Sequence, residues 1–162
     1  MQATKDSFYI TLRDRLVTVD PQRTITIDGA TRPAIVVAEN EPPNAAPPVS
    51  DAFYLYWGGA RAMPASSSLM EMECTIAYRT KGSEANGGLD RGRTLANLDN
   101  DVLAICSPPR TEKCDYSTGA DVDLGSNIFW TPPVLSALVN APPFVGREVS
   151  VMVFFYPEVN QT

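Results

Sequence analysis

The chain has 162 residues, of which 44% are hydrophobic and 20% are charged, and its formal net charge is −6. This composition is typical of one globular domain and is too apolar for general disorder. The acidic balance argues against tight binding to nucleic-acid phosphates, which requires clustered Lys and Arg.

Three absences narrow the possible function classes further. The sequence contains no histidine, which excludes Ser–His and Cys–His nucleophile systems and most zinc sites. No segment approaches the roughly 20 apolar residues that span a bilayer, and residues 1–6 lack the apolar core of a signal peptide. We therefore expect a protein that is made in the cytoplasm and has no membrane partner.

The first predicted element is an N-terminal helix that Thr4 or Asp6 caps and that ends at Asp20-Pro21. Its apolar face consists of Phe8, Leu12, Leu16 and Val19. Residues 24–27 then predict a strand, Asp28-Gly29 a turn, and residues 34–38 the return strand of a hairpin. Residues 40–50 carry two proline doublets, which predict a long surface loop.

The middle of the chain contains two predicted strands. The first, over residues 53–57, is aromatic and is expected to end at Gly58-Gly59, and residues 61–68 predict a second loop. The second strand opens at Met70, where Met70, Met72, Cys74, Ile76 and Tyr78 alternate with Glu71, Glu73, Thr75, Ala77 and Arg79. This period of two places one set in a core and the other toward water or a partner.

A flexible loop and a helix follow this strand. Residues 81–88 are rich in turn-forming types, and we expect a mobile loop at about 80–91. Leu95, Leu98, Val102 and Ile105 then recur at helical spacing until Pro108-Pro109 ends the helix.

The last part of the chain predicts two more strands. Residues 107–127 show no period, whereas residues 128–130 predict a short strand. In the final strand, Val149, Val151, Val153 and Phe155 alternate with Ser150, Met152, Phe154 and Tyr156. Because both sets are largely apolar, the strand is expected to lie centrally or to be covered by a partner. The order α-β-β-β-β-α-β-β predicts a single α+β domain, in which helices pack on one face of an antiparallel or mixed sheet.

Few residues suggest catalysis or metal binding. Glu71 and Glu73 lie on one strand face about 7 Å apart, a spacing that could serve glycoside hydrolysis, but an exposed polar strand face explains the pair better. Residues 99–101 and 121–123 hold paired aspartates without the glycine and distal glutamate of a calcium loop. The three cysteines have no metal-like spacing, and two of them occupy apolar positions typical of buried thiols. We predict no enzyme activity, metal or cofactor.

Several charged and aromatic residues are candidates for an interface with another chain. Arg91 and Arg93 stand at a helix start, where positive charge opposes the helix dipole, so they either meet acidic groups of a neighbouring chain or are solvated surface charge. Aromatic strand residues are mostly core, yet Trp and Tyr are also enriched at subunit interfaces. The candidate interface set is Lys81, Glu84, Arg91, Arg93, Trp57 and Trp130.

The arrangement resembles the tail terminator, or tail-completion, proteins of long-tailed bacteriophages. The matching phrases are LMEMECTIAYRTKG at 69–82, GGLDRGRTLANLDNDVLAICSPP at 87–109, KCDY at 113–116, NIFW at 127–130 and REVSVMVFFYP at 147–157. The proline-rich loop at 40–50 fits the compact core of this family less well than the rest of the chain does.

The resemblance implies a virion protein of the phage neck. In that family about six small α+β subunits form a ring, which caps the tail tube, ends its polymerisation and joins the head connector. DNA would pass through the hole without specific binding, and the loop from Lys81 to Arg91 would contact the tube or the neighbouring subunit. The alternatives are a head–tail adaptor or other minor tail protein, a generic binding module and, most distantly, a hydrolase that uses Glu71 and Glu73.

Overall fold

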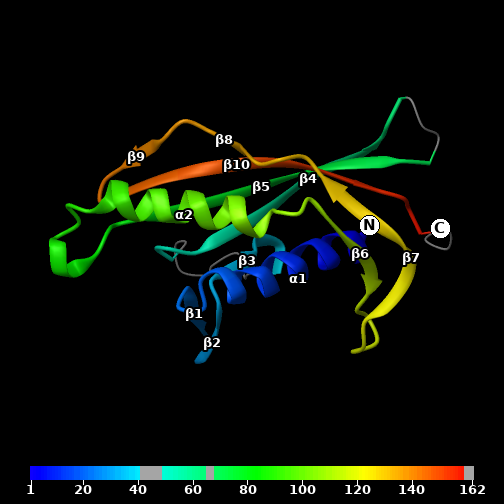
Figure 1. Cartoon of the computed structure of the whole chain (residues 1–162), viewed down its shortest axis with the longest axis horizontal. Helices are drawn as coiled ribbons and strands as arrows, with labels where there is room; N and C mark the ends of the chain where they lie inside the picture. Colours follow the sequence, from blue (N-terminus) through cyan, green and yellow to red (C-terminus); the bar gives the residue numbers. More distant parts are fainter. Residues whose placement is uncertain (41–48, 65–67, 159–162) are drawn as a thin grey trace.

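In the described part of the chain, two α-helices pack on one face of a curled, mixed β-sheet, so the predicted α+β class is confirmed (Figure 1). The structure is a computed structural model that describes residues 1–40, 49–64 and 68–158. The helices are α1, Gln2–Val19, and α2, Arg91–Ile105. The strands are β1 Thr24–Ile27, β2 Ala30–Pro33, β3 Ile35–Val37, β4 Phe53–Ala62, β5 Met70–Thr80, β6 Arg110–Asp115, β7 Val122–Trp130, β8 Val134–Leu135, β9 Val139–Ala141 and β10 Phe144–Phe155. Short 3₁₀ turns, η1 and η2, occupy Ala38–Asn40 and Glu84–Asn86.

The main sheet has the order β3-β4-β5-β10-β7-β6, and β8 and β9 also pair with β10. The β3–β4 pairing is parallel and the other pairings are antiparallel. Strands β1 and β2 form a separate two-stranded hairpin. The final strand β10 is therefore central, as its two largely apolar faces predict.

The N-terminal helix lies where the sequence predicts it, with two differences at its ends. Phe8, Leu12 and Leu16 are fully buried, whereas Val19 is exposed in the last turn. The predicted caps are wrong: the helix begins at Gln2 and Met1 is its N-cap, so Thr4 and Asp6 lie inside the helix. The backbone N–H of Lys5 donates to the Met1 carbonyl at 3.2 Å, so helical bonding starts at the first residue.

The alternation in β5 is confirmed. Met72, Cys74, Ile76 and Tyr78 face the core, where they join inward residues of β4 and β10 and the apolar faces of both helices. The second helix is also confirmed, because its four periodic residues are buried. All three cysteines are free and buried.

Two strand boundaries differ from the prediction in the first half of the chain. The return strand of the hairpin is β2, because Asp28 and Gly29, both at positive φ, place Ala30 opposite Ile27. The predicted return segment at 34–38 instead supplies β3, which joins the main sheet. Gly58-Gly59 does not end β4, since the strand continues to Ala62 through an irregularity between Trp57 and Ala60.

The stretch 107–127, for which the sequence predicts no helix or strand, differs most from the prediction. It contains β6 and most of β7, which pair as a hairpin with a register shift between Glu112 and Cys114. The predicted strand at 128–130 is the end of β7. Mixed polar residues and this shift break the period of two, so the pattern was hidden in the sequence.

Parts of the two predicted loops at 40–50 and 61–68 lie outside the described residues, namely 41–48 and 65–67. Among the residues that are described, no helix is both long and apolar enough to cross a membrane.

Candidate functional site

The sheet face opposite the helices, called here the outer face, is a candidate binding surface. It is formed by residues of β4, β5 and β10 that alternate with core residues: Tyr54, Tyr56, Glu71, Glu73, Thr75, Ala77, Arg79, Phe144, Glu148, Ser150, Met152 and Phe154. Most of them are half-buried and Tyr56, Glu73 and Glu148 are exposed. Neither of the two described helices covers this face, since both pack on the core side.

A groove of about 200 Å³ opens on the outer face. Tyr54 and Tyr56 line one side, and Val139, Ala141 and Phe144 line the other. The guanidinium of Arg79 lies 4.1 Å from the centre of the Phe144 ring, within the range of a cation–π contact. The groove is thus mainly apolar and suits a side chain better than a charged substrate.

The two glutamates of β5 share the outer face as predicted, but each has its own partner. Glu71 forms an ion pair with Arg61 at 2.5 Å, and Glu73 accepts a hydrogen bond from the hydroxyl of Ser150. The paired carboxylates therefore take part in cross-strand contacts.

The aspartates with calcium-like spacing are also used locally. Asp99 accepts hydrogen bonds from the Tyr78 hydroxyl and from Arg147 Nε, and Asp101 forms an ion pair with Arg23 at 2.7 Å. Asp123 accepts the backbone N–H of Gly125. In the described chain, no group of three His, Cys, Asp or Glu side chains is arranged to hold a metal ion.

The loop from Lys81 to Asp90 is organised around the Asp90 carboxylate. It accepts hydrogen bonds from Asn86 Nδ2 at 3.0 Å, from the Ser83 hydroxyl at 2.7 Å and from the Ser83 backbone N–H at 2.9 Å. These bonds, led by that from Asn86, lower the pKa of Asp90 to about 2. The loop predicted to be mobile is therefore held together by hydrogen bonds to the charged Asp90 carboxylate.

The charged interface candidates in and after this loop differ in whether they already have a partner within the chain. Arg91 folds back, and its Nε donates to the Lys81 carbonyl at 3.2 Å. Lys81 and Glu84 form an exposed ion pair at 3.1 Å. Arg93 is exposed and forms no ion pair or side-chain hydrogen bond with any described residue. Of the two arginines, Arg93 is the one that remains available to another chain.

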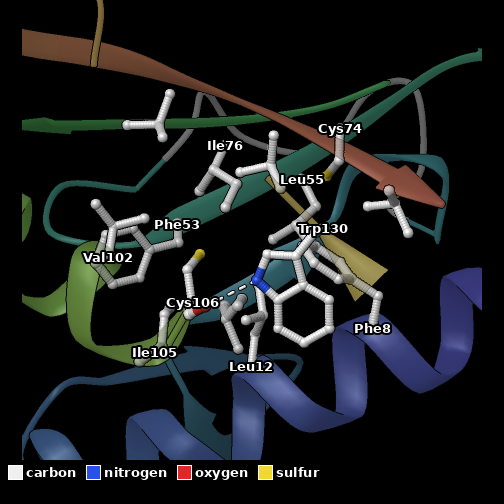
Figure 2. Packing of buried hydrophobic residues seen from close by; sticks show 14 of the residues in the cluster. Phe8, Leu12, Phe53, Leu55, Cys74, Ile76, Val102, Ile105, Cys106 and Trp130 are labelled. Carbon is white, nitrogen blue, oxygen red and sulfur yellow. Dashed lines mark hydrogen bonds between the residues drawn. The ribbon is translucent and has the colours of Figure 1, made fainter. Parts of the chain in front are cut away.

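The two tryptophans pack around Phe8 rather than at a free surface. The Phe8 ring lies 5.4 Å from Trp57 and 5.1 Å from Trp130, edge-on to both. Figure 2 shows Trp130 inside the core, where its indole Nε1 donates to the Cys106 carbonyl at 2.8 Å. Trp130 is only 4% exposed, so it offers almost no surface to a neighbouring subunit. Trp57 is half-buried beneath Lys5, whose Nζ is 5.8 Å from its ring centre.

Lys113 is a buried charged residue that the sequence pattern does not predict. Lys113 Nζ donates to the Tyr156 carbonyl at 2.6 Å and forms an ion pair with Glu158 at 2.5 Å. The amino group of Met1 binds the other oxygen of Glu158 at 2.8 Å. Burial alone would raise the pKa of Glu158, but the two ammonium groups outweigh it and hold the pKa at about 2. This cluster joins β6 and the start of α1 to the segment after β10. The only sequence signal for this cluster is the single lysine, Lys113, in a stretch that shows no period.

Comparison with known proteins identifies no relative: no protein-family model matches the chain, and no curated protein sequence matches it.

Proposed function

We propose that this chain is a structural protein of a bacteriophage neck that acts as a tail terminator. Several copies, six in the simplest case, close into a ring that caps the tail tube, ends its polymerisation and joins the tail to the head connector. The mechanism is steric: one side of the ring complements the tube, and the other has no surface that would template a further tube layer. Closed cyclic symmetry converts a head-to-tail contact into a finite assembly.

The observation that carries this proposal is the one-sided sheet. Both described helices pack on one face, while the outer face keeps Tyr56 exposed and Phe154 half-buried. Tyr54, on the same face, packs against a small second cluster of Ile25, Ala34, Val36 and Ala52. A sheet face of this kind favours contact with another protein surface, since Tyr and Phe are enriched in interfaces. The polar groups that could have suggested catalysis, Glu71 and Glu73, are occupied by Arg61 and Ser150. This arrangement favours an assembly role over a hydrolase.

The overall charge suits a ring that surrounds DNA. At −6 per chain, a ring would repel the phosphate backbone and let it pass without being held. Arg93, exposed at the start of α2, is the cation placed best to meet an acidic group of a neighbouring subunit or of the tube protein.

The test is to add the chain to polymerising tail-tube protein and to measure tube lengths by electron microscopy. A terminator shortens or caps the tubes. A head–tail adaptor would leave tube length unchanged and a tube protein would become part of the tubes, and either result would contradict the proposal.

A matched pair of variants sharpens this assay. Arg93→Glu should reduce capping at least about tenfold, because a like charge would face an acidic partner. Arg110→Glu changes another exposed arginine, on β6, and should cap normally. Equal capping by both variants would remove Arg93 from the interface.

A further inference from the structure

The longest uncharged stretch of the chain runs through its most exposed strands. No residue from Leu124 to Gly146 carries a charge, and no other interval between charged residues is as long. Every residue from Ser136 to Pro143 is exposed. This part of the chain, residues 134–143 with β8 and β9, is called here the uncharged band.

The uncharged band displays large apolar side chains to solvent. Val134 is 65% exposed, Leu138 51% and Val139 54%. Val139 and Ala141 also form one wall of the groove opposite Tyr54 and Tyr56. The exposed apolar surface is therefore continuous with a hollow that can receive a side chain from another molecule.

The band also has a free strand edge. Among the described strands, β8 and β9 pair only with β10, and Figure 1 shows them along one long border of the molecule beside β10. The opposite edge of β9 therefore presents unpaired backbone N–H and C=O groups, which favour pairing with another chain. Proteins that stay monomeric commonly protect such an edge with a Lys or Pro in the strand or with a covering loop. Strand β9 itself contains neither, because its residues are Val139, Asn140 and Ala141 and the Pro142-Pro143 doublet comes after them.

We propose that the uncharged band is the surface by which one copy of this chain binds a second copy; this rests on the proposed function, which requires several copies in contact. Two chains that each carry −6 repel one another wherever their acidic surfaces meet, and the band is the part of the surface where that repulsion is absent. A differently charged partner would be recruited through complementary charge, and the band offers none. Interfaces between identical chains are in turn depleted of charged residues at their centre and are more apolar than other interfaces.

The test compares three exposed apolar residues by sedimentation across a concentration series. Leu138→Lys and Val139→Lys place a charge in the band, and Leu103→Lys places one on the exposed side of α2, where the side chain is 42% exposed. Because all three side chains are exposed, the variants should unfold at the same denaturant concentration as the parent chain. The band variants should associate at least about tenfold more weakly than the parent chain, and Leu103→Lys should associate normally. In the parent chain, amide hydrogen exchange at residues 137–141 should slow on association.

The other outcomes separate this inference from the proposed function. Rings that persist in both band variants would overturn the inference and leave the proposed function intact, and rings that persist but no longer cap tubes would assign the band to the tube protein. A parent chain that forms only a two-fold dimer, dissolved by Leu138→Lys, would support the inference and contradict the ring. A parent chain that is monomeric under every condition, with tube protein included, would overturn both.

Discussion

Lys113 shows how one buried charge can determine the position of the segment that follows β10. Its ammonium group is 1% exposed, lies 5.6 Å from the centre of the Phe155 ring and has Glu158 and a backbone carbonyl as its polar partners. A buried ion is tolerated only where it is paired and hydrogen-bonded. The cluster therefore fixes the segment after β10 against α1.

Removal of this ammonium group should destabilise the fold. Lys113→Met keeps the length of the side chain but leaves Glu158 with only the amino group of Met1. We expect the free energy of unfolding, measured by urea denaturation, to fall by about 2 kcal/mol. Lys81→Met is the matched control, because the exposed Lys81–Glu84 pair should contribute less than about 0.5 kcal/mol. Equal effects of the two variants would mean that the buried pair contributes no more than a surface pair.

The same cluster predicts a pH dependence. The pKa of Glu158 is about 2 in the folded chain, below its ordinary value of 4.5, so the unfolded chain binds this proton more readily. The stability contributed by the carboxylate is fully present above about pH 4.5 and is lost as the pH falls toward 2. Urea denaturation at several pH values should show a difference between the parent chain and Glu158→Gln that shrinks over this window. A difference that is constant from pH 6 to pH 2.5 would contradict this assignment.

At the scale of elements, the connection between β5 and α2 has very close packing around two of its glycines. A Cβ at Gly82 would lie 2.7 Å from Asp90 Oδ1, and one at Gly88 would lie 2.7 Å from the Lys81 carbonyl oxygen. Both residues also have positive φ, which only glycine adopts readily. The loop therefore depends on these two glycines to wrap around Asp90.

Two neighbouring glycines provide a direct test. Gly87→Ala adds a methyl group in open space at φ +58 and should cost about 1 kcal/mol, from backbone strain alone. Gly88→Ala adds the same strain at φ +78 together with the clash on Lys81, and should cost about 3 kcal/mol. Thermal or urea unfolding measures both values. Equal costs for the two variants would show that the loop moves aside and is not held around Asp90.

The elements that were predictable from the sequence are those in which one face is buried uniformly. Residues 70–80 and 95–105 alternate or recur cleanly because each element lies against a single core. Strands β6 and β7 were hidden, because a buried Lys113 and exposed Val122 and Leu124 reverse the usual pattern of apolar inside and polar outside. The Gly58-Gly59 pair predicts a strand end, but it lies inside β4, at the register shift between Trp57 and Ala60.

The candidate site was predictable only in part, for a different reason. Sequence pattern assigns a side chain to a face, as it did for Glu71 and Glu73, but not to a partner on another strand such as Ser150. Trp57 and Trp130 looked equivalent in the sequence, and only tertiary packing around Phe8 makes Trp130 core and leaves Trp57 half-exposed. The groove requires residues of β4, β5, β9 and β10 to meet on one face of the sheet, an arrangement that no local pattern encodes.

At the scale of the whole molecule, the structure has distinct surfaces on its different sides. Figure 1 shows the loop between β5 and α2 at one end of the long axis, with the uncharged band along one long border and the β1–β2 hairpin on the opposite side, beyond α1. Different surfaces on opposite sides favour head-to-tail contacts, which close into rings when the rotation between subunits is right. The proposed terminator role requires this asymmetry.

The most direct test of that role is the mass of the chain, measured by light scattering over a concentration series, alone and with tail-tube protein present. The chain has a mass of 17.6 kDa. We expect a discrete ring of several copies, six in the simplest case, that forms alone or on addition of tube protein and does not grow further. A mass of one copy under both conditions would contradict this expectation.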